Sequence, residues 1–592
     1  MIFRKLIKTK LFFFILLSSA VFFIYAKSLS FGFTDLDDDT LVVKNIHYIS
    51  NISNIHKHFL TDCYYIHDFQ YYRPVLSVSF SIESMLFGGN PKIYHINNMI
   101  FFILSVFLMY CLLDKLNFNK TIVKIICMLV AVHPVFTSCA VWIPARNDTL
   151  LLIFLILSLI NFINYLEKND IKYLILYGFF FITALFTKET TVILIPLYVF
   201  FAYCFNFKIS KEKIFKIFLM MVPILIIYFI LRSIAVPSVN IEEYFFNWQK
   251  YSSNIIKGIM LYVDKFLEPG YIQVMLYSIK LNLKIILINA AVYSILVFLY
   301  CKNIINRKIM LFGIIWFIVC LLPTFFTPEY LFLTHRVIIS SLGMIMIVAL
   351  IADRFICMYP SIKKYLSVLS VILFLVFSYF SYFESDKYEN PDVFWTNAYM
   401  DEKEYHVVYF TLAQRYLVYK DYKKAKQMIE KAVDLSPNVT NFIELTRISF
   451  LINKNIEEAE ANYLNILDKT NGENFQCFFA LSEIYYLKKD IPKAVEYAKK
   501  AANLRENDIV SLENLAQLYA INREYRKAID ISFKLLKLNK EKKEYYYYNI
   551  SLLYRDLENN QQSLLYIKKA LQINPGNYEY KKILEELVKQ KE

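Results

Sequence analysis

The chain has 592 residues, of which 57% are hydrophobic and only 20% are charged. A soluble globular protein with this balance would lack the polar side chains that cover a surface, so much of the chain is expected to lie in a membrane. The sequence contains neither a P-loop nor a Gly-x-Gly-x-x-Gly motif, which argues against ATP-driven pumps and dinucleotide enzymes. The net charge of +14 is divided among short basic runs between apolar stretches, which argues against a nucleic-acid partner.

Apolar stretches of membrane-spanning length fill residues 1–384. We expect about eleven spans, because each stretch has the roughly 17–22 residues that a helix needs to cross a bilayer. Their centres fall near residues 18, 104, 129, 156, 179, 197, 223, 292, 317, 346 and 374. The first stretch follows a basic cluster but has no clear cleavage site, so we interpret it as an uncleaved anchor and not as a signal peptide.

Lysine and arginine residues are biased toward one side of these spans. Short cytoplasmic loops are enriched in both residues, so the basic N-terminus is expected in the cytoplasm. The long loops 27–93 and 235–283 then lie outside, and an odd number of spans places the C-terminal half outside too. We predict a multi-pass membrane protein, and its composition favours a bacterial inner membrane.

The first outer loop begins with four carboxylates in five positions: Asp35, Asp37, Asp38 and Asp39. Such crowding raises at least one pKa, because like charges repel. A carboxylate with a raised pKa is suited to act as a general base, and a group of carboxylates can also hold a cation. A solvated acidic turn is the alternative interpretation of these four residues alone.

Other polar residues lie at the ends of later spans, and the predicted topology puts all of them outside. Ionisable groups near bilayer depth are costly and usually functional. A transporter would carry some of them in mid-span along a central pathway, whereas these gather at one membrane face. For each arginine, interfacial snorkelling or an ion pair is the structural alternative. The candidates are Arg73, His133, Arg146, Asp148, Lys188, Glu189, His335 and Arg336, with Glu329 as a further one.

The C-terminal residues, from 401 onward, repeat with a period of 34 or 35. Small residues recur at Ala425, Ala459, Ala494, Ala528 and Ser563. A second small position and an aromatic position follow the same period, although Arg447 stands where the other repeats are small. The pattern resembles the tetratricopeptide repeat, a helix–turn–helix unit that stacks into a solenoid. We expect about five repeats and a capping helix over 401–592, joined to the membrane part by a linker, 385–400.

The motifs of the membrane half also resemble those of a known family. DDD, YRPVLS, LFGGNP with YHINN, HPVFTSCAVWIPARND, TKE and HR occur in the order found in the transmembrane and tetratricopeptide-repeat O-mannosyltransferases of the GT-C superfamily. The resemblance covers nearly the whole chain. It implies an all-α, GT-C-type membrane domain followed by the solenoid. It also implies inverting transfer of mannose or a similar hexose from a polyprenyl-phosphate donor to a hydroxyl of a protein or cell-surface acceptor.

The resemblance assigns roles to the candidate residues. Asp37 and Asp38 match the family's acidic pair, one of which would be the base, and Asp39 would be a supporting carboxylate. The departing phosphate needs fixed cations. Arg73, Arg146 and Arg336 are the candidates for this, with Lys188 and His335 as support. His133, Asp148 and Glu189 would support the same site.

The sequence leaves several partners open. The histidines fit no recognised metal-ligand spacing, but some GT-C enzymes use a divalent cation, so the metal requirement is undecided. The repeats would bind a protein or peptide acceptor. Two other functions stay open, namely a polytopic transporter and a non-enzymatic scaffold for envelope assembly.

Overall fold

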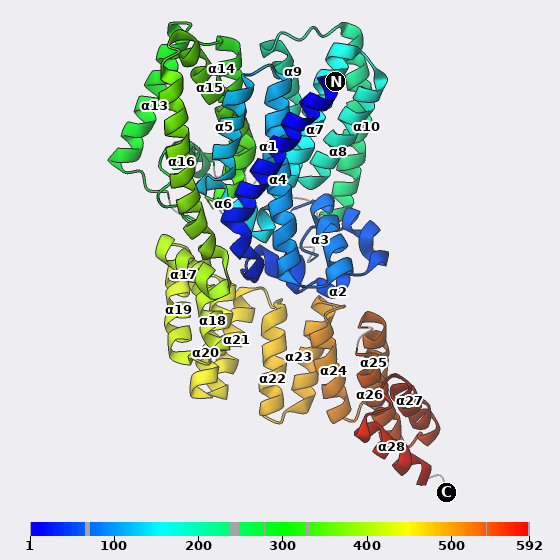
Figure 1. Ribbon diagram of the computed structural model, residues 1–592. Coiled ribbons are helices and arrows are strands. Elements are labelled where there is room, and N and C mark those ends of the chain that lie inside the picture. Colours follow the sequence, from blue (N-terminus) through cyan, green and yellow to red (C-terminus); the bar gives the residue numbers. More distant parts are fainter. Residues whose placement is uncertain are drawn as a thin grey trace. The chain divides into compact units, whose positions relative to one another are not determined.

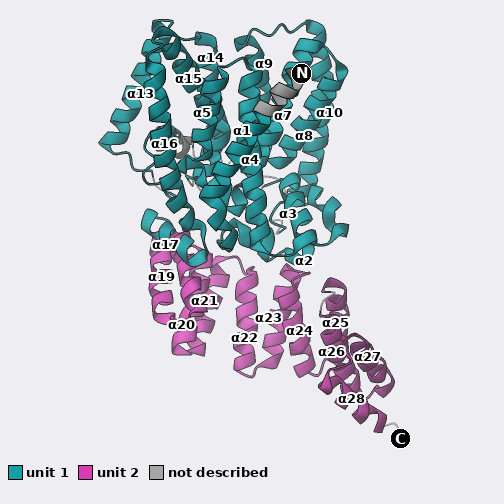
Figure 2. Cartoon of the chain, in the orientation of Figure 1, with its two compact units in different colours: residues 1–405 teal, residues 406–592 magenta. Residues whose placement is uncertain are grey.

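The computed structural model describes residues 2–65, 71–236, 248–277, 279–326, 332–539 and 542–589. The chain divides into two compact units, residues 1–405 and 406–592 (Figures 1 and 2). Within the described residues, pairing of extended segments is limited to one isolated antiparallel bridge between Leu276 and Phe332. The predicted all-helical fold class is therefore confirmed.

Unit 1 is a bundle of apolar helices. Its longer helices are α1 (Ile2–Tyr25), α3 (Pro74–Phe87), α4 (Pro91–Lys115), α5 (Lys120–Ala131), α7 (Arg146–Lys168), α8 (Ile171–Thr187), α9 (Leu194–Cys204), α10 (Lys211–Ala235), α12 (Trp248–Leu267), α13 (Leu283–Cys301), α14 (Arg307–Leu321), α15 (Val337–Met358), α16 (Ile362–Glu384) and α17 (Pro391–Asp401). Two short helices, α2 (Ile46–Ile49) and α6 (Thr137–Val141), lie between them. Short 3-10 or π turns join several of these helices; those used below are η6 (Glu189–Ile193), η8 (Thr334–Arg336) and η9 (Ser385–Tyr388).

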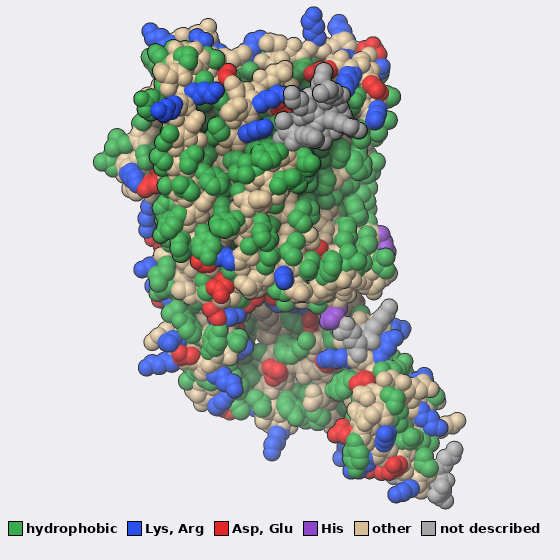
Figure 3. Space-filling view, in the orientation of Figure 1, with side chains coloured by type: hydrophobic (Ala, Val, Ile, Leu, Met, Phe, Trp, Pro, Cys, Tyr) green, Lys and Arg blue, Asp and Glu red, His purple; other side chains and the backbone are tan. Residues whose placement is uncertain are grey.

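Within the described residues, eight helical stretches of unit 1 are long and apolar enough to cross a membrane, and a ninth is formed by Lys120–Ala131 and Pro134–Val141, which are bent by 60°. Two shorter apolar helices, Ile171–Thr187 and Glu189–Cys204, occupy the remaining places at which the sequence predicts spans. All eleven predicted centres thus fall inside apolar helical segments. Figure 3 shows a broad hydrophobic band on the visible face of unit 1, with lysine and arginine side chains gathered at its upper end.

Helices α14 and α15 approach each other closely at two glycines. A Cβ atom added at Gly343 would lie 2.2 Å from the carbonyl oxygen of Gly313, and one added at Gly313 would lie 2.7 Å from that of Gly343. Small residues allow helices to pack this closely in a membrane. The two glycines therefore set the distance between α14 and α15.

The expected linker, residues 385–400, is instead helical and belongs to unit 1. It forms η9 and most of α17, and Tyr388, Phe394 and Trp395 are all buried. Aromatic side chains of this size favour packing over solvation, because each buries a large apolar area. The boundary between the two units lies later, between Tyr405 and His406.

Unit 2 is the predicted solenoid of five helix pairs and a last helix. Its helices are α18 (His406–Val418), α19 (Tyr422–Leu435), α20 (Val439–Asn453), α21 (Ile456–Lys469), α22 (Phe475–Leu487), α23 (Ile491–Leu504), α24 (Ile509–Ile521), α25 (Tyr525–Leu538), α26 (Lys543–Asp556), α27 (Asn560–Ile573) and α28 (Tyr578–Lys589). The repeated small residues are buried where paired helices meet. In the last pair, for example, Ser551 Oγ donates to the Ser563 carbonyl oxygen at 2.8 Å.

Candidate active site

Asp38 closes the turn that follows α1. Its carboxylate accepts hydrogen bonds from the backbone N–H of Thr34 at 2.7 Å, from the Thr34 hydroxyl at 3.0 Å and from the backbone N–H of Leu36 at 3.1 Å. Asp35 adopts a left-handed conformation (φ 54°) inside this turn, which aspartate tolerates better than most residues. Burial raises the pKa of Asp38 to about 7, although the bonds from Thr34 and Leu36 oppose the rise. Asp38 is therefore committed to holding the turn.

Asp37 points to a different environment. It is only partly buried, and it forms a side-chain hydrogen bond with Tyr64. Burial raises its pKa, while the nearby charges of Arg73 and Arg336 favour the ionised carboxylate. Asp37 therefore lies close enough to Arg73 and Arg336 for their charges to act on its carboxylate.

Asp148 joins two of the predicted phosphate-binding residues. It lies in the first turn of α7, where Lys188 Nζ is 2.8 Å from Oδ1 and His335 Nε2 is 3.7 Å from Oδ2. Asp148 and His335 are buried, whereas Lys188 is partly exposed in the break between α8 and η6. Burial lowers the pKa of Lys188, and the Asp148 carboxylate opposes this shift. Asp148 thus holds a lysine that still reaches the surface.

Arg73 lies at the start of α3 and pairs with Glu189. Its Nε and Nη2 atoms lie 3.4 Å and 3.3 Å from the two carboxylate oxygens of Glu189, and its guanidinium lies over the ring of Tyr71, 4.4 Å from the centroid. The side-chain amide of Asn147 lies between Arg73 Nη1 and the carbonyl oxygen of Thr187. Arg73 is therefore fixed by three neighbours in a planar, donor-rich arrangement, which suits an oxyanion.

These residues form one cluster, which we call the acid–cation cluster: Asp37, Arg73, Asp148, Lys188, Glu189, His335 and Arg336. It joins the loop after α1, the N-terminus of α7, the α8–η6 break and η8. The electrostatic influence of Arg336 reaches Asp37, Lys188 and Tyr71. An anion entering beside Asp37 would meet Arg73, Lys188 and Arg336, while Asp37 could accept a proton from a neighbouring hydroxyl.

Arg146 does not belong to the acid–cation cluster. It is completely buried, and its Nη1, Nε and Nη2 atoms donate to Glu83, Asn98 and the carbonyl oxygen of Tyr94 at 2.7, 2.8 and 3.1 Å. Its guanidinium also lies 4.5 Å from the ring centroid of Phe80. Because these contacts enclose it, Arg146 is a structural residue, contrary to its predicted role in phosphate binding.

His133 and Asp39 also lie apart from the cluster. His133 accepts from the Val135 N–H through Nδ1 and donates to the Phe266 carbonyl oxygen through Nε2, so its ring is a buried connector between α5 and α12. Asp39 pairs with Lys44 at 2.5 Å. Glu329 lies outside the described residues. Within those residues, no group of three or more His, Cys, Asp or Glu side chains is placed to hold a metal ion.

The structure adds residues to which the sequence assigned no role. Tyr64 contacts Asp37, Asn147 lies beside Arg73, and Glu83 is the partner of Arg146. Asn147 stands between Arg146 and Asp148 in the sequence, so its position could have identified it as a candidate site residue. Tyr64 stands near Asp62 and His67, and Glu83 stands among apolar residues and serines, so neither lies at the end of a predicted span like the other candidates.

Unit 2 contains a groove of about 770 Å³ on its α20, α22 and α24 helices. Aromatic and amide side chains line it, including Phe450, Phe479, Gln476, Asn514 and Gln517. Arg447 also lies in this groove and binds Glu444 through Nε at 2.9 Å and Nη2 at 2.5 Å. Helix α20 is unbroken around Arg447, so the second repeat keeps the helix pair of the others.

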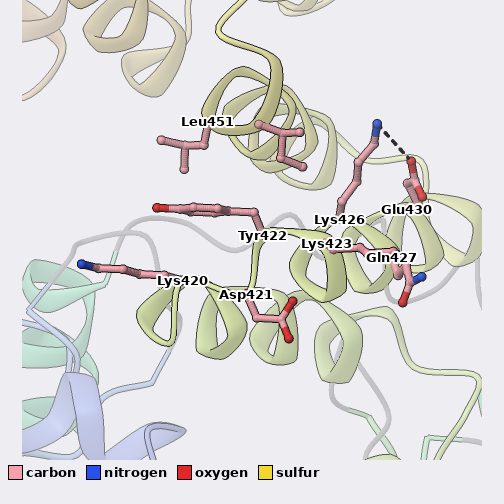
Figure 4. A pocket seen from close by; sticks show the side chains of 9 residues that line it. Lys420, Asp421, Tyr422, Lys423, Lys426, Gln427, Glu430 and Leu451 are labelled. Atoms are coloured by element: carbon pink, nitrogen blue, oxygen red, sulfur yellow. Dashed lines mark ion pairs between the residues drawn. The ribbon is translucent and has the colours of Figure 1, made fainter.

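A second hollow of unit 2, of about 930 Å³, lies beside α19. Figure 4 shows that most of its lining is polar or charged, and Lys426 and Glu430 form an ion pair across 3.8 Å. The aromatic and amide groove is therefore the better place for a peptide chain, because it offers both apolar contact and backbone hydrogen bonding.

Comparison with known proteins matches both units. The family described as dolichyl-phosphate-mannose-protein mannosyltransferase matches residues 74–235, and the tetratricopeptide repeat matches residues 407–439 and 545–577. Residues 74–235 are therefore similar to a mannosyltransferase family, and parts of unit 2 are similar to tetratricopeptide repeats. Residues 74–235 include Arg73's neighbours in α3 together with Asp148, Lys188 and Glu189, so this match covers much of the acid–cation cluster.

Two curated proteins are similar to part of this chain. Protein O-mannosyl-transferase TMTC1 of Mus musculus is 30% identical over 99 residues, which are 17% of this chain and 10% of the relative. The protein of the same name from Homo sapiens is 26% identical over 132 residues, which are 20% of this chain and 15% of the relative. The similarity thus spans a small part of the relatives' length.

Among solved structures, the one described as "Crystal structure of YrrB: a TPR protein with an unusual peptide-binding site" is 20% identical to this chain. It covers 31% of this chain and 93% of its own length, with a TM-score of 0.26.

Proposed function

We propose that the protein is a membrane glycosyltransferase that moves mannose or a similar hexose from a polyprenyl-phosphate donor to a hydroxyl group. The observation that carries this proposal is the meeting of Asp37 with Arg73, Lys188 and Arg336 at the ends of apolar helices. A base beside several fixed cations is what transfer from a sugar phosphate requires. Matches to mannosyltransferases support the sugar and the reaction class.

In the proposed reaction, Asp37 accepts the proton of the acceptor hydroxyl. The acceptor oxygen then forms a bond to the anomeric carbon while the bond from that carbon to the phosphate oxygen breaks. The bonding pair leaves with the polyprenyl phosphate, whose added negative charge Arg73, Lys188 and Arg336 stabilise. Attack from the face opposite the phosphate inverts the configuration at the anomeric carbon. Asp148 and Glu189 hold the cations in place through their ion pairs.

The cluster is proposed to lie on the extracytoplasmic face. The basic inner loops predicted from the sequence support this orientation, as does the position of lysine and arginine at one end of unit 1 (Figure 3). The tetratricopeptide repeats would then bind a protein acceptor on the same side. The groove that contains Phe479, Asn514 and Gln517 is the proposed acceptor site, because amide side chains pair with an extended backbone.

The deciding experiment measures label transfer from radiolabelled polyprenyl-phosphate mannose in membranes that contain the full chain. Wild type should label a protein fraction, and Asp37→Asn should reduce the rate about a hundredfold or more, the usual effect of losing a general base. Asp353→Asn is the matched control, because Asp353 only accepts from Asn119 at an exposed site. No transfer from any of a panel of polyprenyl-phosphate sugars would overturn the proposal in favour of a transporter or a scaffold.

Acceptor binding needs a separate test. Asn514→Ala with Gln517→Ala in the groove should lower transfer into protein and leave the apparent KM for the donor unchanged. Gln561→Ala with Gln562→Ala removes two amides from α27, outside the groove, and should leave transfer as in wild type. Equal transfer by both double variants would remove the groove from the proposal.

A further inference from the structure

The turn that carries Asp37 is held by two indole groups. Trp142 Nε1 donates to the Thr34 hydroxyl at 3.0 Å, and Trp395 Nε1 donates to the Thr34 carbonyl oxygen at 3.1 Å. Thr34, Trp142 and Trp395 are all at least 97% buried. Buried hydrogen bonds of this kind are hard to replace, because water cannot reach the groups left unpaired.

Thr34 connects the two tryptophans to the acidic turn through its own hydrogen bonds. Its N–H and hydroxyl both donate to Asp38, the residue next to Asp37. All three polar groups of Thr34 are therefore used: the N–H donates to Asp38, the hydroxyl donates to Asp38 and accepts from Trp142, and the carbonyl oxygen accepts from Trp395. The position of Asp37 depends on a threonine that is fixed from two directions.

The second tryptophan comes from a distant part of the sequence. Trp395 lies on α17, and the preceding residue, Phe394, stacks on Trp142 with ring centroids 6.3 Å apart and planes 19° apart. Close by, the Gly32 N–H donates to the Glu389 carbonyl oxygen at 2.8 Å. The segment from Glu389 to Trp395 thus packs along the loop that leads to Asp37.

Trp142 also touches the cationic side of the cluster. Its ring centroid lies 5.1 Å from that of His335, which in turn lies beside Asp148. The same indole group therefore contacts Thr34, which holds the turn with Asp37, and His335, which lies beside Asp148 and next to Arg336. Together with Phe394, it sets the distance between the acidic turn and the cationic side of the cluster.

We propose that Trp395 is a positioning residue for the acidic turn: through Thr34 it fixes Asp37 relative to Arg73, Lys188 and Arg336. Its effect on catalysis rests on the proposed function, whereas its effect on the turn rests on the contacts alone. Helix α17 is then part of the active-site framework as well as the last helix of unit 1 before the repeats.

The test compares Trp395→Phe with Trp316→Phe in the full-length protein. Both changes remove a buried indole N–H and keep an aromatic ring, but Trp316 donates to the Ile339 carbonyl oxygen, within α15 and away from the turn. Amide hydrogen exchange of a peptide that covers residues 31–39 should be about threefold to tenfold faster in Trp395→Phe, as expected for the loss of one buried hydrogen bond. Trp316→Phe should leave exchange in that peptide unchanged. Unchanged exchange in both variants, or equal acceleration in both, would overturn the proposal.

Transfer kinetics provide the second measurement. Trp395→Phe should lower kcat and leave the apparent KM for the donor unchanged, because the cations that bind phosphate keep their own partners. A raised KM at constant kcat would contradict a role in positioning the base. If wild type transfers no sugar, the proposed function fails, and the exchange measurement still decides whether Trp395 holds the turn.

Discussion

Arg146 Nη1 lies 2.7 Å from Glu83 Oε1 inside unit 1, and the exposed fractions of the two side chains are only 0% and 6%. This pair joins α7 to α3, and Asn98 of α4 binds the same guanidinium. Taking two charges out of water is costly, so the pair is tolerated only while both partners are present. The interaction is therefore structural, and it holds α3, where Arg73 stands, against the helices that carry Asp148.

We predict that Arg146→Ala lowers the free energy of unfolding by about 3–5 kcal/mol, because Glu83 is left buried without its cation. The measurement is thermal unfolding of the detergent-solubilised protein, with exposed Arg354→Ala as the control. Arg146→Met combined with Glu83→Leu should recover much of the loss, since neither buried charge then remains. A double variant as unstable as Arg146→Ala would contradict this explanation.

Gly343→Ala should destabilise the helix pair α14–α15. The added Cβ would lie 2.2 Å from the Gly313 carbonyl oxygen and 3.1 Å from the Phe317 nitrogen, and backbone atoms cannot move aside as a side chain can. We expect a loss of about 1–3 kcal/mol, typical of overpacking. Gly270→Ala is the control, because no atom lies within 4 Å of its added Cβ. If both variants unfold at the same temperature, the close approach of the glycines is not needed for stability.

Much of this fold could be predicted because it follows from periodic patterns. The length of apolar stretches locates the helices of unit 1, and the recurrence of Ala425, Ala459, Ala494, Ala528 and Ser563 locates the helix pairs of unit 2. The segment 385–400 was different. Its role depends on Phe394 and Trp395 meeting Trp142 and Thr34, and no local pattern records contacts between residues so far apart.

The candidate site was predictable only in part for the same reason. Sequence position relative to the spans identified Asp37, Arg73, Lys188 and Arg336 as groups that could meet at one membrane face. Sequence position could not separate Arg146 from Arg73, because both are polar residues at the predicted outer ends of apolar segments. The difference lies in their partners: Glu83 and Asn98 enclose Arg146, whereas Arg73 stays partly exposed beside Glu189.

Arg73→Lys should impair transfer although it keeps the positive charge. Lysine cannot reproduce the two donors that Arg73 directs at Glu189, nor its planar contact with Tyr71. We expect transfer to fall about tenfold for Arg73→Lys and about a hundredfold or more for Arg73→Ala, as for other lost donors to a developing anion. The matched control is Lys115→Ala, which breaks an exposed ion pair with Glu167. Full activity of Arg73→Ala would remove Arg73 from the proposed phosphate site.

The pH dependence of transfer should report the acidic turn. Burial raises the pKa of Asp37 and raises that of Asp38 to about 7, so both carboxylates take up a proton at a higher pH than exposed aspartates do. A general base acts in its ionised form. Activity should therefore fall as the pH drops and Asp37 takes up a proton. Protonation of Asp38 has a different effect, because its pKa is higher in the folded state than in the unfolded state: stability should rise as the pH falls from about 7 to the usual aspartate value near 4.

Thr34→Val tests whether Asp38 causes the pH dependence of stability. Valine removes the hydroxyl that donates to Asp38, so the pKa of Asp38 should rise further, and the stability that protonation of Asp38 adds should appear at a higher pH. The control is Thr183→Val, whose hydroxyl only donates to the Phe179 carbonyl oxygen at an exposed position on α8. Detergent-solubilised variants would be compared by their melting temperatures between pH 5 and 9. A profile of melting temperature against pH that stays in place, or moves to lower pH, would mean that the Thr34–Asp38 bonds do not control the ionisation of Asp38.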